Sequence, residues 1–158
     1  MVGRGAQCLI YPTRPTSRGT VTLRSADPAD LPVIAPNALD TDYDRHISVE
    51  MVRYVRKLFA TSPLSDLVAG ETLPGAEVES DEEILQAIRT KGTWGFHTCG
   101  TARMGSDPAS VIDPQLRVRG VEGLRVVDAS VFPTVPSSNT TAPVAALAWR
   151  AAEIIRAA

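Results

Sequence analysis

The sequence predicts an α+β fold in a single domain, because short extended segments and helical segments both occur within 158 residues. Residues 17–25 alternate apolar Val21 and Leu23 with polar neighbours, the two-residue period of a half-buried strand. Residues 124–128 read Leu-Arg-Val-Val-Asp and predict a second short strand. Three longer segments show helical spacing, and a hydrophobic content of 44% is sufficient for one core.

The first two helices are predicted from their caps as much as from their apolar residues. One helix is expected from about Asp44 to Ala60, with cap candidates and negative charge at residues 40–44 and a stop at Ser62-Pro63. Its apolar stripe consists of Met51, Val52, Val55, Leu58 and Phe59. The second is expected to follow Ser80, because Ser80 and Glu83 form a capping box, and to end at Gly92.

The last helix is predicted to begin near Pro143, since proline is common in a first turn. The four residues that could cap it are Ser138, Asn139, Thr140 and Thr141. Its apolar stripe consists of Val144, Leu147, Ala148, Ala151, Ile154 and Ile155. Much of its opposite face is alanine, so burial on more than one side is expected.

Composition excludes several classes of function. A net charge of -2 favours neither nucleic acid nor an anionic membrane, and no run approaches the about 20 apolar residues of a membrane span. The first residues lack the apolar core of a secretory signal. Two cysteines, Cys8 and Cys99, make no disulfide framework, so reduced thiols and a cytoplasmic location are expected. Two distant histidines and no Cys-x-x-Cys predict no metal site.

Two residues are candidates for chemistry, His97 and Asn139. His97 lies in a loop rich in glycine and aromatic residues, and its neutral imidazole can accept a proton near physiological pH. A structural role for such a histidine is the alternative. Asn139 alone indicates a turn or helix cap, but a helix N-terminus beside it also favours an anion.

The other nucleophilic or basic side chains are weaker candidates. His46 begins the first predicted helix among acidic residues, which indicates a solvated position. Cys99 lies two residues after His97, and side chains so close on an extended loop point apart, which argues against a Cys–His nucleophile. The sequence contains no Gly-x-Gly-x-x-Gly after a strand, so it shows no dinucleotide-binding unit of its own.

Residues 97–105 read His-Thr-Cys-Gly-Thr-Ala-Arg-Met-Gly, and residues 136–143 read Pro-Ser-Ser-Asn-Thr-Thr-Ala-Pro. In these segments the chain resembles the C-terminal region of the glucose–methanol–choline (GMC) flavin oxidoreductases. The family pattern His-x-x-Gly-Thr-x-x-Met-Gly is matched by His97, Gly100, Thr101, Met104 and Gly105. Residues 111–130 continue the match, and Ser138-Asn139-Thr140 with Ala142-Pro143 closes it. Ser17-Arg-Gly-Thr-Val and Pro36-Asn37 extend the resemblance to nearly the whole chain.

The resemblance implies a role for each candidate residue. His97 would act as the base facing the flavin ring, and Asn139 would complete the pair and orient the alcohol during hydride transfer to flavin N5. Asp128 and Ala129 would line the ribityl and pyrophosphate of FAD. Thr140 and Thr141 would face the flavin from the N-terminus of the last helix.

The resemblance also implies an architecture for residues 1–158. Residues 1–115 would form the substrate-domain part, an antiparallel sheet with helices on one face. Residues 116–158 would be a strand and helix that return to the FAD-binding domain. That FAD-binding half, with its glycine fingerprint, is expected to be absent from this sequence.

The chain is therefore expected to bind little FAD alone, to act on a small alcohol, and to need an FAD-binding domain or subunit. Self-association through the apolar C-terminal segment is expected if that partner is missing. The alternative is a non-catalytic binding or assembly module derived from such an enzyme.

Overall fold

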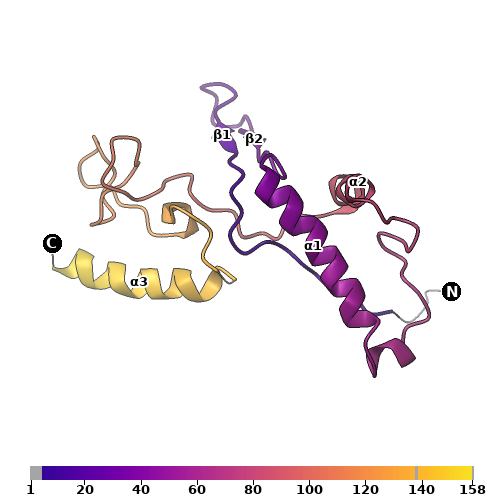
Figure 1. Cartoon of the computed structure of the whole chain (residues 1–158). Helices are drawn as coiled ribbons and strands as arrows, with labels where there is room; N and C mark the ends of the chain where they lie inside the picture. Colours follow the sequence, from indigo (N-terminus) through magenta and orange to yellow (C-terminus); the bar gives the residue numbers. More distant parts are fainter. Residues whose placement is uncertain (1–4, 138, 158) are drawn as a thin grey trace. The chain divides into compact units, whose positions relative to one another are not determined.

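The computed structural model describes residues 5–137 and 139–157, which form a small α+β structure (Figure 1). Its elements are β1 (Thr20–Thr22), β2 (Val33–Ala35), α1 (Asp42–Phe59), η1 (Leu64–Asp66), α2 (Asp81–Lys91), η2 (Ala129–Val131) and α3 (Thr141–Arg156). The chain divides into two compact units. Unit 1 contains the described residues up to Pro12 and Asn37–Trp94, and unit 2 contains Thr13–Pro36 and the described residues from Gly95 onward.

Unit 1 consists mainly of two capped helices. The Thr41 side chain accepts the Asp44 N–H at the start of α1, at 3.2 Å. Ser80 and Glu83 form the expected capping box of α2, and Gly92 follows its last turn. The core between the helices consists of Val49, Val52, Ile84 and Leu85. Both helices, their caps and their ends are therefore confirmed.

The two strands belong to unit 2 and form a two-stranded antiparallel sheet. Thr20 pairs with Ala35 and Thr22 with Val33. Val21 is nevertheless 49% exposed and Leu23 is 87% exposed. The expectation of a half-buried strand is therefore wrong for the described residues, because three residues in each strand are too few to carry a covered face.

Helix α3 packs on the core of unit 2 along a single stripe. That core consists of Ile112, Leu116, Val131 and Ala151, and Leu147 packs against it. Pro143 lies in the first turn, as expected. Ala151 is the one buried residue of α3, whereas Trp149 is 76% exposed. Burial on more than one side is thus wrong for the described residues, because the core meets one face of this helix.

The strand expected at residues 124–128 is also absent from the described residues. This segment forms a single bridge, between Arg117 and Arg125, and Val126 donates its N–H to the Leu116 carbonyl at 3.2 Å. The reason is a tight return of the chain, in which Gly120 and Gly123 adopt positive φ values of 77° and 73°. The pairing that results is too short for a strand.

Within the described residues, no helix is both long and apolar enough to cross a membrane. The expected division of the chain between residues 115 and 116 stays a prediction.

Candidate active site

The structure brings His97 and Asn139 together within unit 2, although 42 residues separate them. The Nε2 atom of His97 lies 3.1 Å from Oδ1 of Asn139. Its Nδ1 atom lies 3.1 Å from the hydroxyl oxygen of Thr140. One imidazole therefore contacts an amide on one side and a hydroxyl on the other. The two residues thus lie side by side, and their expected catalytic roles stay predictions.

The residues that follow His97 tie its loop to the segment after Asp128. The Ala102 N–H donates to the Ser130 carbonyl at 3.0 Å, and the Met104 N–H donates to the Val131 carbonyl at 2.8 Å. Gly100 begins this connection with a φ of 93°, a conformation that disfavours any residue with a Cβ. Met104 then packs on the core of unit 2. Backbone conformation thus explains the glycine at position 100, and core packing explains the methionine at position 104.

Gly105, the last residue of the motif, lies where the chain passes close to a turn. A Cβ at this position would lie 2.8 Å from Oδ2 of Asp107 and 3.1 Å from Cβ of Ser110. Arg103 donates two hydrogen bonds to the Asp107 carboxylate, at 2.8 and 2.7 Å. These bonds lower the pKa of Asp107 from 3.8 to about 2, with a smaller contribution from the Ala109 N–H. The turn is therefore closed by an ion pair at the surface.

Asp128 and Ala129, two of the expected cofactor residues, lie at the start of η2. Asp128 is the N-cap, and its carboxylate accepts the Ser130 N–H at 2.7 Å. Hydrogen bonds from the Ser130 side chain and main chain lower the pKa of Asp128. Asp128 itself is exposed and Ala129 is half-buried. Both residues therefore lie beside the segment that is bonded to the His97 loop.

Thr140 and Thr141, the other two expected cofactor residues, begin α3. Thr140 is the N-cap by position, but its side chain makes no capping bond, and Thr141 is the first helical residue. The first turn of α3 contains no acidic residue, whereas those of α1 and α2 contain two and three. Ser138, the remaining cap candidate, lies outside the described residues. The positive end of the α3 dipole thus lies directly beside His97.

The remaining sequence candidates take no part in this arrangement. His46 is an exposed residue of α1, in agreement with its expected solvated position. Cys99 is half-buried, and burial raises the pKa of its thiol, which disfavours the thiolate that a nucleophile needs. Among the described residues, no group of three or more His, Cys, Asp or Glu side chains could hold a metal ion.

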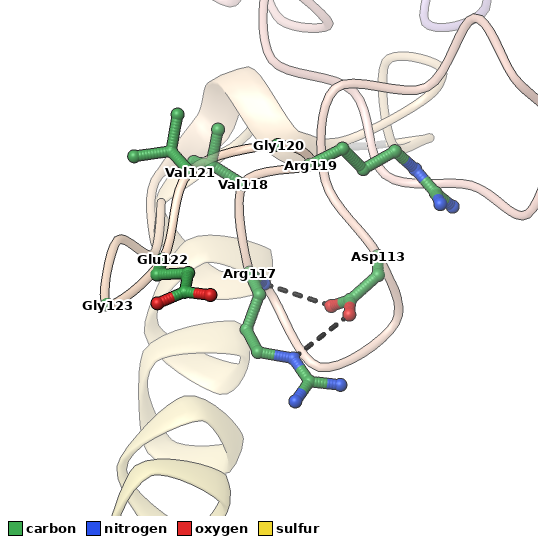
Figure 2. A pocket seen from close by; sticks show the side chains of 8 residues that line it. All are labelled: Asp113, Arg117, Val118, Arg119, Gly120, Val121, Glu122 and Gly123. Carbon is green, nitrogen blue, oxygen red and sulfur yellow. Dashed lines mark hydrogen bonds and ion pairs between the residues drawn. The ribbon is translucent and has the colours of Figure 1, made fainter.

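The hollow that Figure 2 shows is separate from these residues. It has a volume of about 500 Å³, and its lining consists of Asp113 and residues 117–123. The Asp113 carboxylate accepts the main-chain N–H and the Nε–H of Arg117, each at 3.0 Å. None of the expected site residues lies in this lining. The hollow therefore contains none of the residues for which the sequence predicts chemistry.

A family profile described as GMC oxidoreductase matches residues 15–148. The chain belongs to the GMC oxidoreductase family. An alcohol dehydrogenase [acceptor] of Pseudomonas putida is 42% identical to this GMC chain over 154 residues, which are 98% of the chain and 28% of that protein. The mitochondrial choline dehydrogenase of Homo sapiens is 44% identical over 152 residues, which are 95% of the chain and 26% of that protein. The chain thus spans about a quarter of the length of these curated relatives.

Solved structures of GMC relatives give the same fold. A fungal aryl-alcohol oxidase matches with a TM-score of 0.80 and 37% identity, over 90% of the chain and 24% of that protein. A formate oxidase from Aspergillus oryzae RIB40 matches with a TM-score of 0.84 and 36% identity, over 90% of the chain and 25% of that protein. An FAD-dependent oxidoreductase from Chaetomium thermophilum matches with a TM-score of 0.81 and 33% identity, over 91% of this chain and 25% of that protein.

The donor groups of this GMC chain fit one part of FAD. An imidazole, an amide and a helix N-terminus without acidic residues suit a ring that gains negative charge on reduction. The sequence contains no Gly-x-Gly-x-x-Gly turn for the phosphates. The groups around His97 would therefore suit the flavin ring, and Asp128 and Ala129 stay the predicted residues along the ribityl and pyrophosphate.

Sequence reasoning missed the contact between Thr140 and His97. It assigned Thr140 to the cofactor or to the helix cap, because both roles follow from its position before the helix. No local pattern links a hydroxyl to an imidazole 43 residues earlier. Only the three-dimensional structure shows this neighbour.

Proposed function

We propose that this chain is the catalytic C-terminal part of an FAD-dependent enzyme that oxidises a small alcohol. The observation that carries the proposal is the 3.1 Å approach of His97 Nε2 to the Asn139 amide, beside the N-terminus of α3. This arrangement offers one group that can accept a proton and one that can hydrogen-bond the same oxygen. The family membership of the chain supports the same reaction class.

In this proposal His97 takes the hydroxyl proton of the alcohol, and the alcohol becomes a carbonyl compound. Asn139 hydrogen-bonds the same oxygen and holds it beside the imidazole. FAD, when bound, supplies the acceptor at N5 for the hydride that leaves the carbon. The first turn of α3 adds positive potential next to the site, which favours the negative charge that the reduced ring gains.

The proposed cofactor contacts come from two segments of unit 2. Thr140 and Thr141 would face the ring from α3, and Asp128 and Ala129 would lie along the ribityl and pyrophosphate. An FAD-binding domain or subunit would complete the site and cover residues 116–158. This chain covers only 28% of the alcohol dehydrogenase, 24% of the aryl-alcohol oxidase and 25% of the FAD-dependent oxidoreductase, so each has room for such a domain.

The test compares His97→Ala, Asn139→Ala and the exposed His46→Ala in the enzyme that contains this chain and its FAD-binding domain. His97→Ala is expected to lower the rate of alcohol oxidation by about 10²–10⁴-fold, because a positioned acid–base group is lost. Asn139→Ala is expected to lower the rate by a smaller factor, because the Asn139 amide orients the alcohol and does not accept its proton. The control His46→Ala is expected to retain the rate of the unaltered enzyme. Activity retained in His97→Ala would contradict the proposal.

A second candidate function, a non-catalytic binding or assembly module, is favoured by two exposed apolar side chains of α3. Trp149 is 76% exposed and Ile155 is 47% exposed, although both are large apolar side chains. Such a module would associate with itself or with a partner and hold no flavin. Co-purification with an FAD-binding domain, followed by measurement of the flavin absorbance, separates the two functions. A complex without flavin and without alcohol oxidation would support the module.

A further inference from the structure

Residues 133–137 lead to Asn139, and one hydrogen bond ties them to the rest of unit 2. Two of these residues are prolines, which have no N–H to donate. Within residues 133–137, all of which the structure describes, the single hydrogen bond is the one that the Ser137 hydroxyl accepts. Its donor is the Nε–H of Arg14, which lies 123 residues earlier in the chain and in the same unit. Hydrogen bonding thus holds this segment through a distant side chain and not through its own backbone.

The direction of this hydrogen bond follows from the chemistry of its donor. A guanidinium stays protonated and has N–H groups but no acceptor, so the Ser137 oxygen accepts. The charge on the donor makes such a bond stronger than one between two neutral groups. The Arg14–Ser137 pair therefore exists in one protonation state, and it can be removed from either side.

Arg14 belongs to a short segment that has contacts of its own. The Nη1 group of Arg18 donates to three carbonyls of this segment, at 3.2, 3.3 and 3.1 Å, those of Pro15, Thr16 and Ser17. Gly19 then lies so close to β2 that an added Cβ would be 2.4 Å from the Ala35 carbonyl oxygen. The backbone that carries Arg14 is therefore folded by contacts other than the bond to Ser137.

The same segment also lies near the His97 loop. Burial raises the pKa of the Cys99 thiol, and the charge of Arg18 opposes that rise, which places this guanidinium near the thiol. Cys99 is two residues after His97, and Ser137 is two residues before Asn139. Two residues of extended chain span at most about 7 Å, so both contacts are made close to the two candidate residues. The segment thus meets each of the two loops that bring the imidazole and the amide together.

We propose that Arg14 is a positioning residue for Asn139, because through Ser137 it holds the amide 3.1 Å from Nε2 of His97. This inference rests on the proposed function, in which that amide orients the alcohol. On its C-terminal side the amide is followed by α3, which packs on the core of unit 2. The freedom that remains lies on the side of residues 133–137. Loss of the Arg14 bond releases that side, and the amide then occupies a wider range of positions.

The first experiment is a double-mutant cycle in the enzyme that contains this chain and its FAD-binding domain. Arg14→Met is expected to lower kcat for alcohol oxidation by about 3–10-fold, the effect of one hydrogen bond. Ser137→Ala is expected to cause a similar loss, whereas Ser137→Thr keeps a hydroxyl and retains the rate. In an Asn139→Ala background, Arg14→Met is expected to change kcat by less than about twofold, because it acts only through the amide. The matched control is Arg24→Met, which removes an Nε–H that donates to the Leu31 carbonyl of unit 2 at 3.3 Å and is expected to retain the rate.

The cycle separates this inference from the function on which it rests. An equal loss from Arg14→Met with and without the Asn139 side chain overturns the inference, and Ser137→Ala gives the same test if Arg14→Met does not fold. If His97→Ala and Asn139→Ala slow the enzyme but Arg14→Met and Ser137→Ala do not, the inference fails and the proposed function stands. If His97→Ala leaves the rate unchanged, the proposed function fails first.

The second experiment needs no flavin and follows the side-chain amide of Asn139 by ¹H–¹⁵N NMR in the ¹⁵N-labelled full chain. Arg14→Met and Ser137→Ala are expected to shift the amide signals, because both release the segment before it. Ser137→Thr and Arg24→Met are expected to leave these signals in place. Amide signals that stay unchanged in both Arg14→Met and Ser137→Ala contradict the inference.

Discussion

The two units of the chain are built by different means. Unit 1 obtains its order from two capped helices, α1 and α2, which enclose one apolar cluster. Unit 2 contains one long helix and two short strands, and turns closed by hydrogen bonds make up much of the remainder. The residues proposed for catalysis all lie in unit 2. Regular structure thus occurs mainly in the unit without the site, and irregular structure holds the imidazole.

The two units differ in the sequence separation of the contacts that hold their structure. The caps of α1 and α2 join residues three apart in the sequence, such as Ser80 and Glu83. The bonds that position the His97 loop join Ala102 to Ser130 and Met104 to Val131. A non-local network can bring an imidazole, an amide and a hydroxyl to one place, which a single helix cannot do across 43 residues.

The largest expected effect comes from emptying either core. Ile84 and Ile112 are each 0% exposed, so replacement by alanine is expected to cost about 2–5 kcal/mol of unfolding free energy in either unit. The two variants are expected to differ at the site. Only Ile112→Ala should move the His97 NMR signals, because the Ile112 carbonyl accepts the Gly105 N–H and its side chain packs with Val131. Denaturant unfolding measures the two stabilities, and the NMR spectrum of His97 measures the effect at the site. If Ile84→Ala moved the His97 signals as much as Ile112→Ala, the distinction between the two units would fail.

A smaller effect is expected from the capping box of unit 1. Ser80→Ala removes the acceptor of the Glu83 N–H and is expected to cost about 1 kcal/mol, as a lost N-cap usually does. The control is Ser106→Ala, which alters an exposed serine of unit 2 outside any helix. Urea unfolding of both variants measures the difference. Equal stability of the two variants would show that local capping does not distinguish the units.

The smallest effect is confined to acid and concerns the turn of unit 2. The pKa of Asp107 is lowered from 3.8 to about 2 by Arg103, so its ionised form stabilises the fold above the ordinary pKa. That stabilisation is lost as the pH falls from about 4 towards 2. Asp107→Asn is expected to flatten the dependence of stability on pH in this window and to leave the dependence near neutral pH unchanged. Thermal unfolding at a series of acidic pH values checks the sign, and an unaltered acid profile would count against it.

Local signals in the sequence were enough to predict the helices. Asp44 to Ala60, the Ser80 capping box and the helix near Pro143 were all expected, because caps, stops and apolar spacing lie within a few residues. The apolar pattern failed at residues 124–128. A run of apolar residues predicts a strand, but a strand also needs a partner segment of similar length. Because the chain turns back through Gly120 and Gly123, this segment pairs with its neighbour through a single bridge.

The candidate site was predictable in part. The motif and the resemblance pointed to His97 and Asn139, and the structure places them 3.1 Å apart. The catalytic roles of these two residues stay predictions, as do the cofactor contacts of Asp128, Ala129, Thr140 and Thr141. The partnership of Thr140 with the imidazole could not be predicted, because it depends on where α3 docks on the core of unit 2.

The exposed indole of Trp149 makes α3 suitable for optical measurement. The chain contains two tryptophans, and Trp149 is 76% exposed while Trp94 is 50% exposed. Water around an indole shifts its fluorescence to longer wavelength, so anything that covers this face of α3 would shift the emission of Trp149 to the blue. A Trp94→Phe variant leaves this residue as the single tryptophan emitter. The helix that begins beside His97 therefore carries its own fluorophore for titrations with an FAD-binding domain or for dilution series of the chain alone.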